Sequence, residues 1–431
     1  MRRISKTTIM DTYKPRIADQ MLAAKLRRKG AVLIEGPKWC GKTTTAEQKA
    51  ASVLYMADPM RKAQNIQSAK INVKQLLTGN TPRLIDEWKI APSLWDSVRF
   101  EVDHRKGYGH FILTGSTVPP KAEEIFQGRF AKLKMRTMSL YESGESTGAV
   151  SLSDLFNGKW EPVVGTSPID INRLAFLICR GGWPGALDLE ETDAIGQAYD
   201  YYDVVCDSDL SRVDDVQRDP QRVRLLMRSY ARHQGTMATI GTILADMKAN
   251  EASSLSDNTV YDYIKALKKI FVIEDMPAWN PNLRSKTAIR TSDNHYFIDP
   301  SIATSALGAS PNDLLNDLKT MGLMFETMAI RDLRVYADAL DGQVYHYRDK
   351  NGLECDAVIH LRNGSYGLIE IKLGGDDLIE EGAKSLADLS ADIDTARMKS
   401  PSFMMVLTGV GDFPYQRDDG VLVVPIGCLK A

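Results

Sequence analysis

The chain has 431 residues, of which 43% are hydrophobic and 26% are charged. This length exceeds one ordinary hydrophobic core, so we expect two or three domains in a soluble globular protein. The 54 basic and 56 acidic side chains leave a formal net charge of -2, which excludes a chain coated in positive charge but allows a local basic face that contacts nucleic acid.

Cysteine and histidine usage excludes further classes of protein. The five cysteines are scattered, odd in number and without a CxxC pair, and the six histidines show no metal-ligand spacing. The sequence therefore predicts a reducing compartment, with neither a disulfide framework nor a structural zinc site. No stretch of about 20 apolar residues occurs, and the basic first residues are followed by no long apolar run. We expect no signal peptide, no membrane partner and a cytoplasmic location.

The first predicted element is a short buried strand, residues 31–34, followed by a glycine-rich loop and a helix-compatible run. The loop matches GxxxxGK[ST] in the strand–loop–helix setting that this phosphate-binding motif requires. Backbone N–H groups of such a loop surround the phosphates of ATP or ADP, and the helix N-terminus adds the positive end of its dipole. Lys42 is expected to act on the β- and γ-phosphates as a catalytic cation, and the Thr43 hydroxyl to ligate Mg²⁺. The nucleotide-contacting residues predicted here are Gly36, Pro37, Lys38, Trp39, Cys40, Gly41, Lys42, Thr43 and Thr44.

A second strand, residues 83–85, ends in two acids, Asp86 and Glu87. Asp86 is the expected metal-side residue that holds the Mg²⁺ shell, and Glu87 is the expected catalytic base that polarises the attacking water. Two acids after a strand are usually a solvated loop, but downstream of a phosphate-binding loop they favour a Walker B pair. The sequence therefore predicts ATP hydrolysis as well as ATP binding.

A third strand, residues 111–114, runs into Gly115-Ser116-Thr117. In AAA+ ATPases, which the two preceding motifs resemble, a polar sensor-1 residue lies between the Walker B acids and the γ-phosphate. Ser116 is our choice for that nucleotide-binding position, and Thr114 is the second choice. The alternative is an ordinary turn between a strand and a loop.

A helix-compatible run, residues 121–127, stops at Gly128-Arg129 before a strand-like segment. In AAA+ proteins an arginine at this helix end completes the active site of a neighbouring subunit. If Arg129 acts in this way, it is a catalytic residue that neutralises transition-state charge in trans, and the active protein is a homo-oligomer. The alternative is a surface arginine with no role at the phosphates. Arg16, before the first strand, is a further candidate for contact with the nucleotide.

Residues 150–170 are loop-like, and we place a domain boundary at their start. In the helical segment that follows, a short helix, a turn and a second helix with Ser256 or Asp257 as its N-cap lead into an apolar strand, which is a winged-helix pattern. Such a unit either places its second helix in a DNA major groove or only packs against a neighbouring domain. The RGGWPG turn at residues 180–185 is interpreted as a tight loop that supports the fold. The candidate DNA contacts are Asn258, Lys265 and Lys268.

The last part of the chain combines a helix-compatible run, which contains Glu326, with segments typical of the strands of a small sheet. Asp356 begins one strand, and Glu370 and Lys372 lie on the same face of the next because strand side chains alternate. This set looks like the PD-(D/E)xK nuclease fold, in which Asp356, Glu370 and Glu326 would hold Mg²⁺ and Glu370 and Lys372 would be catalytic. Three interpretations stay open: an active nuclease, a nuclease-like fold that binds without cutting, and a plain ion pair on a strand.

Together these segments resemble a group of prokaryotic ATPases of the AAA+/STAND type. The match includes YKPRIADQML, LIEGPKWCGKTT, LIDEW, FILTGST and QGRF…TMSLYE, and continues through RGGWPG, YIKALKKIFVIEDMPAW, NHYFIDPSIA and GLMFE…LECDAVI…IEIK. It covers nearly the whole chain, although Trp39-Cys40 stand where smaller or polar residues are more familiar. The resemblance implies an ATP-binding protein.

The sequence therefore predicts an α/β protein: an AAA+-like P-loop ATPase domain with a parallel sheet at 1–150, a helical and winged-helix domain at 151–310, and a restriction-endonuclease-like α/β domain at 311–431. Its expected function is to bind and hydrolyse ATP with Mg²⁺ and thereby control a DNA-binding or nuclease-like C-terminal module. The alternative is an ATP-dependent signalling or scaffold protein whose C-terminal domain binds protein and does not cut.

Overall fold

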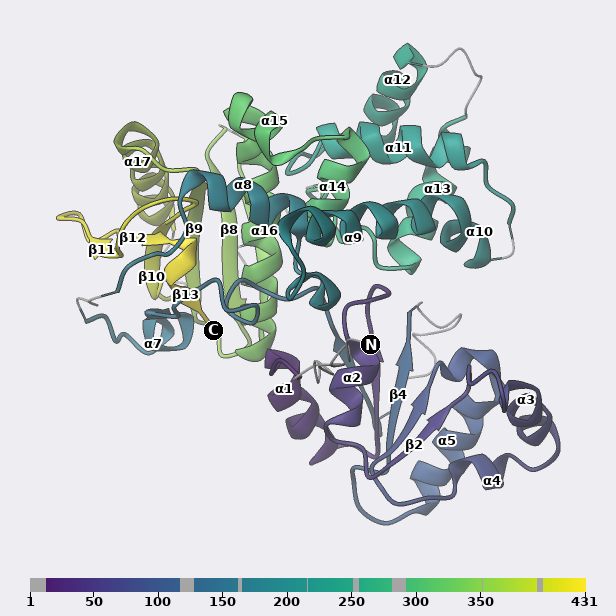
Figure 1. The fold of residues 1–431 in the computed structure, drawn as a ribbon. Helices are drawn as coiled ribbons and strands as arrows, with labels where there is room; N and C mark the ends of the chain where they lie inside the picture. Colours follow the sequence, from purple (N-terminus) through teal and green to yellow (C-terminus); the bar gives the residue numbers. More distant parts are fainter. Residues whose placement is uncertain are drawn as a thin grey trace, which may run out of the picture.

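The computed structural model describes residues 13–116, 128–161, 165–214, 216–250, 256–280, 292–350, 352–393 and 398–431. An N-terminal α/β unit, a helical region and a C-terminal α/β unit follow one another along the chain (Figure 1). Within the described ranges, no helix has both the length and the apolar character needed to cross a membrane.

The N-terminal unit is built on a five-stranded sheet with the order β2-β3-β4-β1-β5, in which all neighbouring strands are parallel. Its strands are β1 (Ala31–Glu35), β2 (Ser52–Tyr55), β3 (Arg83–Asp86), β4 (Phe111–Gly115) and β5 (Phe130–Lys134). Its helices are α1 (Ile17–Leu26), α2 (Lys42–Glu47), α3 (Lys62–Ile71), α4 (Val73–Leu77) and α5 (Ser93–His104), with the 3-10 turn η1 (Trp88–Ile90).

Every residue of β1 and β4 is buried, because apolar clusters cover both faces of this sheet. Since β4 lies between β1 and β3, the carboxyl ends of these three strands meet at one edge. The sheet order therefore brings the loop after β1, the two acids after β3 and the polar end of β4 to the same place.

The helical region contains both short and longer helices. Its elements are α7 (Leu152–Phe156), α8 (Ile171–Arg180), η2 (Pro184–Ala186), α9 (Glu191–Val204), the π-helical turn η3 (Val205–Asp209), α10 (Leu210–Arg212), α11 (Pro220–Arg232), α12 (Ile240–Asn250), α13 (Asp257–Lys269), α14 (Pro300–Leu307) and α15 (Pro311–Asn316). Ser256 caps α13 by accepting a hydrogen bond from the Thr259 N–H. After α13, isolated antiparallel bridges join residues 273–276 to residues 294–297.

The C-terminal unit is a six-stranded mixed sheet with the order β11-β12-β10-β9-β8-β7. Its strands are β7 (Gly342–Arg348), β8 (Glu354–Leu361), β9 (Tyr366–Lys372), β10 (Phe403–Thr408), β11 (Tyr415–Gln416) and β12 (Leu422–Pro425). Helix α16 (Leu318–Ala339) packs with Ile369 on one face, and α17 (Asp376–Asp392) packs with Leu368 on the other, as the alternation of strand side chains requires. A short strand, β13 (Leu429–Lys430), pairs with β6 (Val150–Ser151).

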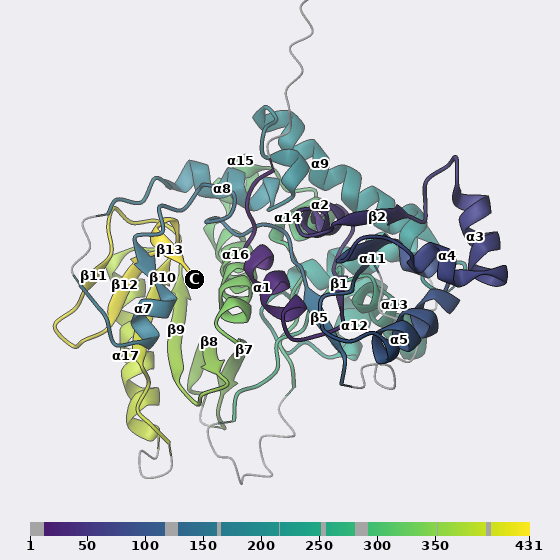
Figure 2. The ribbon, with the colours of Figure 1, turned by 90° about the horizontal axis from the view of Figure 1, so that it is seen from below.

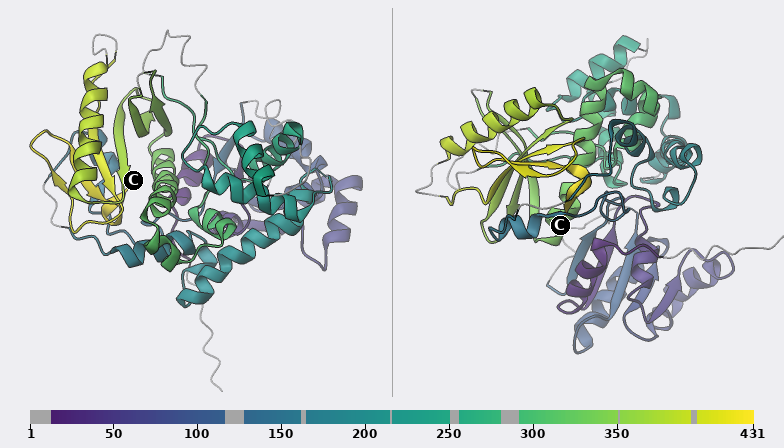
Figure 3. Two further views of the ribbon diagram at one scale, coloured as in Figure 1. Left: turned by 90° about the horizontal axis from the view of Figure 1, so that it is seen from above. Right: turned by 60° about the vertical axis from the view of Figure 1, so that its left-hand side comes forward.

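The helical region and the C-terminal unit share one core. A single cluster of buried side chains extends from Leu140 through the helices to Leu429, so the boundary expected at residue 310 lies within the stretch that builds this core. The N-terminal unit stands beside these two as a distinct body (Figure 3). Its helix α1 lies next to α16, as Figure 2 shows from below.

Candidate nucleotide-binding site

The loop between β1 and α2 has a backbone that few sequences can adopt. Gly41 takes a φ of 92° and Trp39 a φ of 64°, both in the left-handed region. A Cβ at Gly36 would lie 2.2 Å from the Met135 carbonyl oxygen, so only glycine allows the chain after β5 to run this close. Trp39, unlike glycine, carries a Cβ that disfavours the left-handed region. A non-glycine residue held in this conformation is typical of a functional loop.

Lys42 begins α2 and folds back over the loop. Its ammonium donates hydrogen bonds to the carbonyl oxygens of Gly36 at 3.0 Å and Pro37 at 2.6 Å, and the residue is 7% exposed. Both partners are neutral, so the charge of Lys42 is not cancelled by them and stays available to an anionic ligand.

Asp86, the last residue of β3, contacts side chains of helix α2 and strand β4. Its Oδ1 accepts hydrogen bonds from the hydroxyls of Thr43 at 2.6 Å and Thr114 at 2.7 Å. A carboxylate and a hydroxyl are the hard oxygen donors that Mg²⁺ prefers, so Thr43 and Asp86 fit this ion beside a nucleotide. Thr114, the second choice for the sensor position, therefore makes the contact with Asp86, whereas Ser116 follows in the bend after β4.

Glu87 directly follows β3 and also adopts a left-handed backbone, with a φ of 53°. Its N–H donates to the Thr114 hydroxyl at 3.3 Å. Burial raises the pKa of its carboxyl, and Lys42 opposes this shift. A carboxyl whose pKa is raised towards neutrality is suited to accept a proton from water.

Two charged residues near the loop were not predicted from the sequence as parts of the site. Glu35 ends β1 and is 6% exposed, and its Oε2 has no hydrogen-bond partner within the described residues. Burial lowers the pKa of Lys89, on η1, to about 8, although the nearby carboxylates of Glu87 and Glu35 oppose the shift. An acid at the last position of a buried strand is the signal that points to Glu35.

Arg129 lies at the opposite edge of the sheet from the loop. Its carbonyl accepts a hydrogen bond from the Gly30 N–H at 2.9 Å, just before β1 begins. Its guanidinium pairs with the Asp103 carboxylate at 3.1 Å and donates to the Val102 carbonyl at 3.1 Å, at the end of α5. The helix predicted at 121–127 lies outside the described residues.

Arg16 contacts a backbone carbonyl of the loop and not the face of the loop that would bind phosphate. Its guanidinium donates to the Cys40 carbonyl at 2.8 Å and pairs with Glu142 at 3.0 Å. Of the other loop residues, Cys40 is buried and Thr44 is exposed. Arg16 therefore joins the loop to the segment that follows β5.

The residues predicted to form a nuclease-like site in the C-terminal unit also lie close to one another. Lys372 Nζ lies 3.0 Å from Glu370 Oε2, and the Ile371 N–H donates to Asp356 Oδ2 at 2.7 Å. Glu326 Oε1, on α16, accepts a hydrogen bond from the Tyr296 hydroxyl at 2.5 Å. Burial, reinforced by Asp356, raises the pKa values of both Glu326 and Glu370 to about 8.

This group of residues is shielded from solvent. Glu370 is 4% exposed, and its Oε1 is buried without a hydrogen-bond partner among the described residues. A Cβ at Gly235 would lie 2.7 Å from Glu326 Oε1, so the helical region covers this acid. In the described parts of the chain, no group of three or more His, Cys, Asp or Glu side chains is placed to hold a metal ion.

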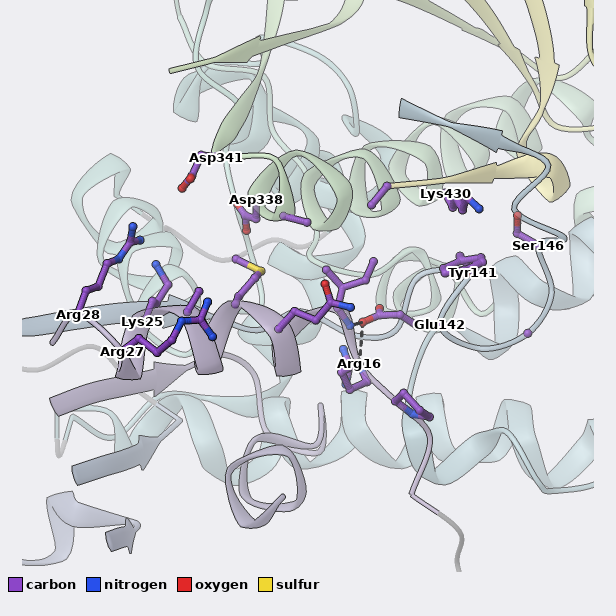
Figure 4. A pocket seen from close by; sticks show the side chains of 18 residues that line it. Arg16, Lys25, Arg27, Arg28, Tyr141, Glu142, Ser146, Asp338, Asp341 and Lys430 are labelled. Carbon is purple, nitrogen blue, oxygen red and sulfur yellow. Dashed lines mark hydrogen bonds and ion pairs between the residues drawn. The ribbon is translucent and has the colours of Figure 1, made fainter. Parts of the chain in front are cut away.

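A separate cleft of about 940 Å³ lies between α1 and the end of α16. Figure 4 shows Lys25, Arg27 and Arg28 at one end of it, with Asp338 and Asp341 across from them. None of the predicted phosphate-loop residues lines this cleft. It separates the N-terminal unit from α16 on this side of the molecule.

Family models match three successive parts of the chain. Residues 28–144 match a family described as an AAA domain, which contains the loop and both Walker B acids. Residues 171–313 match a domain of unknown function, DUF8612, and residues 321–429 match another, DUF4143. Residues 28–144 of the N-terminal unit are therefore similar to an AAA domain. A search of curated proteins found no match.

Solved structures resemble the chain distantly. The Walker-type ATPase PABY2304 of Pyrococcus abyssi is 13% identical, with a TM-score of 0.40, and the match covers 69% of this chain and 99% of that chain. The Aeropyrum pernix ORC1 protein in complex with DNA is 12% identical, with a TM-score of 0.27, over 70% of this chain and 94% of that one. Drosophila ORC bound to DNA is 12% identical, with a TM-score of 0.18, over 70% and 89%. At these TM-scores the likenesses add no argument about function.

Proposed function

We propose that this chain binds ATP with Mg²⁺ at the loop of residues 36–43 and hydrolyses it. The observation that carries the proposal is the hydrogen-bonded group of Thr43, Asp86 and Thr114, which draws together the ends of three chain segments beside the buried Lys42. The match of residues 28–144 to an AAA domain supports the same function.

Each residue has a distinct part in the proposed reaction. The loop N–H groups and Lys42 bind the phosphates and draw charge from the transition state. Thr43 and Asp86 would hold Mg²⁺, which when bound would neutralise charge on the phosphate oxygens. Glu87 accepts the proton of the attacking water. The Thr114 hydroxyl, bonded to both the Asp86 carboxylate and the Glu87 backbone, positions the two acids relative to each other.

The test compares ATP binding and phosphate release in three variants. Lys42→Ala is expected to lose both, because it removes the phosphate-binding cation. Glu87→Gln is expected to bind ATP as the wild type does but to release phosphate at least ~100-fold more slowly. Lys49→Ala, an exposed lysine just beyond the same helix, is the control and should match the wild type. Undiminished phosphate release from Glu87→Gln would show that another group is the base.

For the C-terminal unit, the proposal is a module that responds to the nucleotide by binding a partner without cutting it. The closed position of Glu370, and its ion pair with Lys372, favour this role over cleavage. The second candidate, an ATP-controlled nuclease, rests on the orphaned Glu370 Oε1, an atom that a bound cation would satisfy. Cleavage of plasmid and single-stranded DNA by the wild type, abolished in Asp356→Ala, would favour the nuclease.

DNA remains a candidate partner through α13. Asn258 and Lys265 are exposed on this helix, whereas Lys268 forms an ion pair with Asp275. If α13 contacts DNA, Lys265→Glu weakens binding in a mobility-shift assay and lowers its salt dependence, because one phosphate contact is lost. Binding unchanged by Lys265→Glu would place any DNA contact elsewhere.

A further inference from the structure

Two neighbouring residues of the phosphate loop reach out of the N-terminal unit and touch the helical region. The Lys38 ammonium lies 2.6 Å from Asp209 Oδ1. The ring of Trp39 meets the ring of Tyr201 edge-on, with the centroids 5.6 Å apart. The loop is therefore tied to the α9–η3 segment by one ion pair and one aromatic contact.

Asp209 sits at a special point of its helix. It is the last residue of the π-helical turn η3, and its side chain is 7% exposed. Single π-turns inserted between α-helical segments are rare and are frequently found at functional sites. Asp207, on the same turn, faces a different partner, since it pairs with Arg224 at 2.6 Å. The turn thus presents one buried carboxylate to the loop and one exposed carboxylate to its own region.

Asp209 and the phosphates of a bound nucleotide would compete for the same cation, the Lys38 ammonium. A carboxylate as buried as that of Asp209 needs a cation close by, because an uncompensated buried charge is costly. Lys38 belongs to the loop segment whose backbone surrounds the phosphates.

We propose that Asp209 is a positioning residue that competes with the terminal phosphate of ATP for Lys38, so that ATP binding releases the loop from η3. The inference rests on the proposed ATP binding and adds to it a way of distinguishing ATP from ADP. ADP lacks the terminal phosphate and leaves Lys38 on Asp209. ATP offers Lys38 a stronger, multiply charged partner.

The contact lies at the start of a continuous series of buried groups. Tyr201 packs against Trp183 with the rings tilted and their centroids 4.2 Å apart, and the Trp183 indole donates to the Ser301 hydroxyl at 2.9 Å. Ser301 donates in turn to Asp299, which pairs with Arg331 on α16 at 3.0 Å. Release of the loop would therefore act on groups that hold α16, the helix that carries Glu326.

The test measures the affinities of fluorescent ATP and ADP analogues, with Mg²⁺, by polarisation. Asp209→Asn removes the competing charge, so ATP affinity should rise about tenfold while ADP affinity changes less than about threefold. Asp207→Asn removes the same charge from the same turn and is the matched control; its affinities should equal those of the wild type. In a Lys38→Gln background, Asp209→Asn should give no further gain, because the cation that it frees is gone.

Each result decides a separate point. An Asp209→Asn protein that binds ATP no better than Asp207→Asn, or a gain that persists in the Lys38→Gln background, overturns the role of Asp209. Lys38→Gln by itself must lower the preference for ATP over ADP, and an unchanged preference overturns the inference even if Asp209→Asn does not fold. Failure of the wild type to bind either nucleotide overturns the proposed function and this inference together.

Discussion

Thr114 contacts both of the acids at the end of β3, Asp86 and Glu87. It is 1% exposed, and its hydroxyl both donates to the Asp86 carboxylate at 2.7 Å and accepts from the Glu87 N–H at 3.3 Å. Thr114→Val keeps the shape of the side chain but removes both hydrogen bonds. We expect ATP hydrolysis to fall roughly tenfold or more, because the acids lose their relative orientation, while ATP affinity stays within about twofold.

Steady-state phosphate release and equilibrium nucleotide binding separate these two effects. Ser116→Ala is the control, since Ser116 occupies the alternative sensor position two residues further on. If Ser116→Ala loses hydrolysis and Thr114→Val does not, the sensor role belongs to Ser116.

The buried acids of the C-terminal unit predict a dependence of stability on pH. Burial raises the pKa of Glu326 from 4.5 to about 8, so the folded state retains a proton that the unfolded state releases. This stabilisation is complete below a pH of about 4.5 and is lost as the pH rises through about 8. We therefore expect the Tm to fall between about pH 6 and about pH 8.5, and Glu326→Gln to reduce that fall.

Thermal melts at the two pH values provide the measurement. Glu380→Gln is the control, because Glu380 lies on α17 but is exposed and paired with Arg417. The explanation fails if the wild type and Glu326→Gln lose the same amount of thermal stability.

At the scale of single residues, the sequence predicted what is local. Lys42, Asp86 and Glu87 belong to short motifs whose spacing fixes their surroundings. The partners of Lys38 and Glu326 are different, because Asp209 lies 171 residues beyond Lys38 and Tyr296 lies 30 residues before Glu326. No spacing rule connects such pairs, since packing between separate elements brings them together.

The RGGWPG turn is the element whose role the structure explains best. The Gly182 N–H donates to Asp299 at 3.0 Å, and its carbonyl accepts from the Met138 N–H at 2.7 Å. A Cβ at Gly182 would lie 2.1 Å from the Met138 carbonyl oxygen, so any side chain forces two backbone segments apart. Gly182→Ala should therefore destabilise the protein by more than about 2 kcal/mol.

Gly185→Ala is a matched control within the same turn. The nearest atom to a Cβ at Gly185 is the Gln197 Oε1, at 3.8 Å, so the added methyl meets no backbone. Chemical denaturation of both variants is the measurement, and equal stabilities would mean that the close approach at Gly182 is relieved without cost.

Strands with a strong period of apolar residues were predicted from the sequence. The way in which the elements pack and pair with one another was not predicted. The strand expected at Asp356 appears as β8, and the strand expected to carry Glu370 and Lys372 appears as β9. Alternation of apolar residues is sufficient to predict such elements. The π-turn η3 and the parallel pairing of β10 with both β9 and β12 leave no comparable pattern, because they depend on contacts across the fold.

At the scale of the whole molecule, the segment after β5 joins all three units. Arg136 donates two hydrogen bonds to Glu274, both at 2.7 Å, and one to Asp338 on α16 at 2.6 Å. Glu274 belongs to the helical region, and a buried cation shared between two acids from different units holds them in one geometry. The cleft between α1 and α16 borders this junction, because Asp338, the partner of Arg136, is one of its lining residues.

The placement of Arg129 makes a prediction about the assembly of several chains. The register pairs Ala31 with Phe130, so Arg129 lies beside Gly30, at the far end of β1 from the loop. Five strand residues at ~3.3 Å each separate the two ends of β1, a distance that the arginine side chain does not span. Any part that Arg129 takes in hydrolysis must therefore be at the site of another chain.

We expect Arg129→Ala to bind ATP but hydrolyse it at least ~10-fold more slowly, and Lys42→Ala to be inactive. Mixing the two variants should restore phosphate release, because a Lys42→Ala chain supplies Arg129 to the intact phosphate loop of its neighbour. The specific activity of the wild type should also rise with protein concentration. Arg99→Ala, an exposed arginine on α5, is the control for lost surface charge. Full activity of Arg129→Ala, at every protein concentration, would instead assign this arginine to its ion pair with Asp103 and leave each chain able to hydrolyse ATP alone.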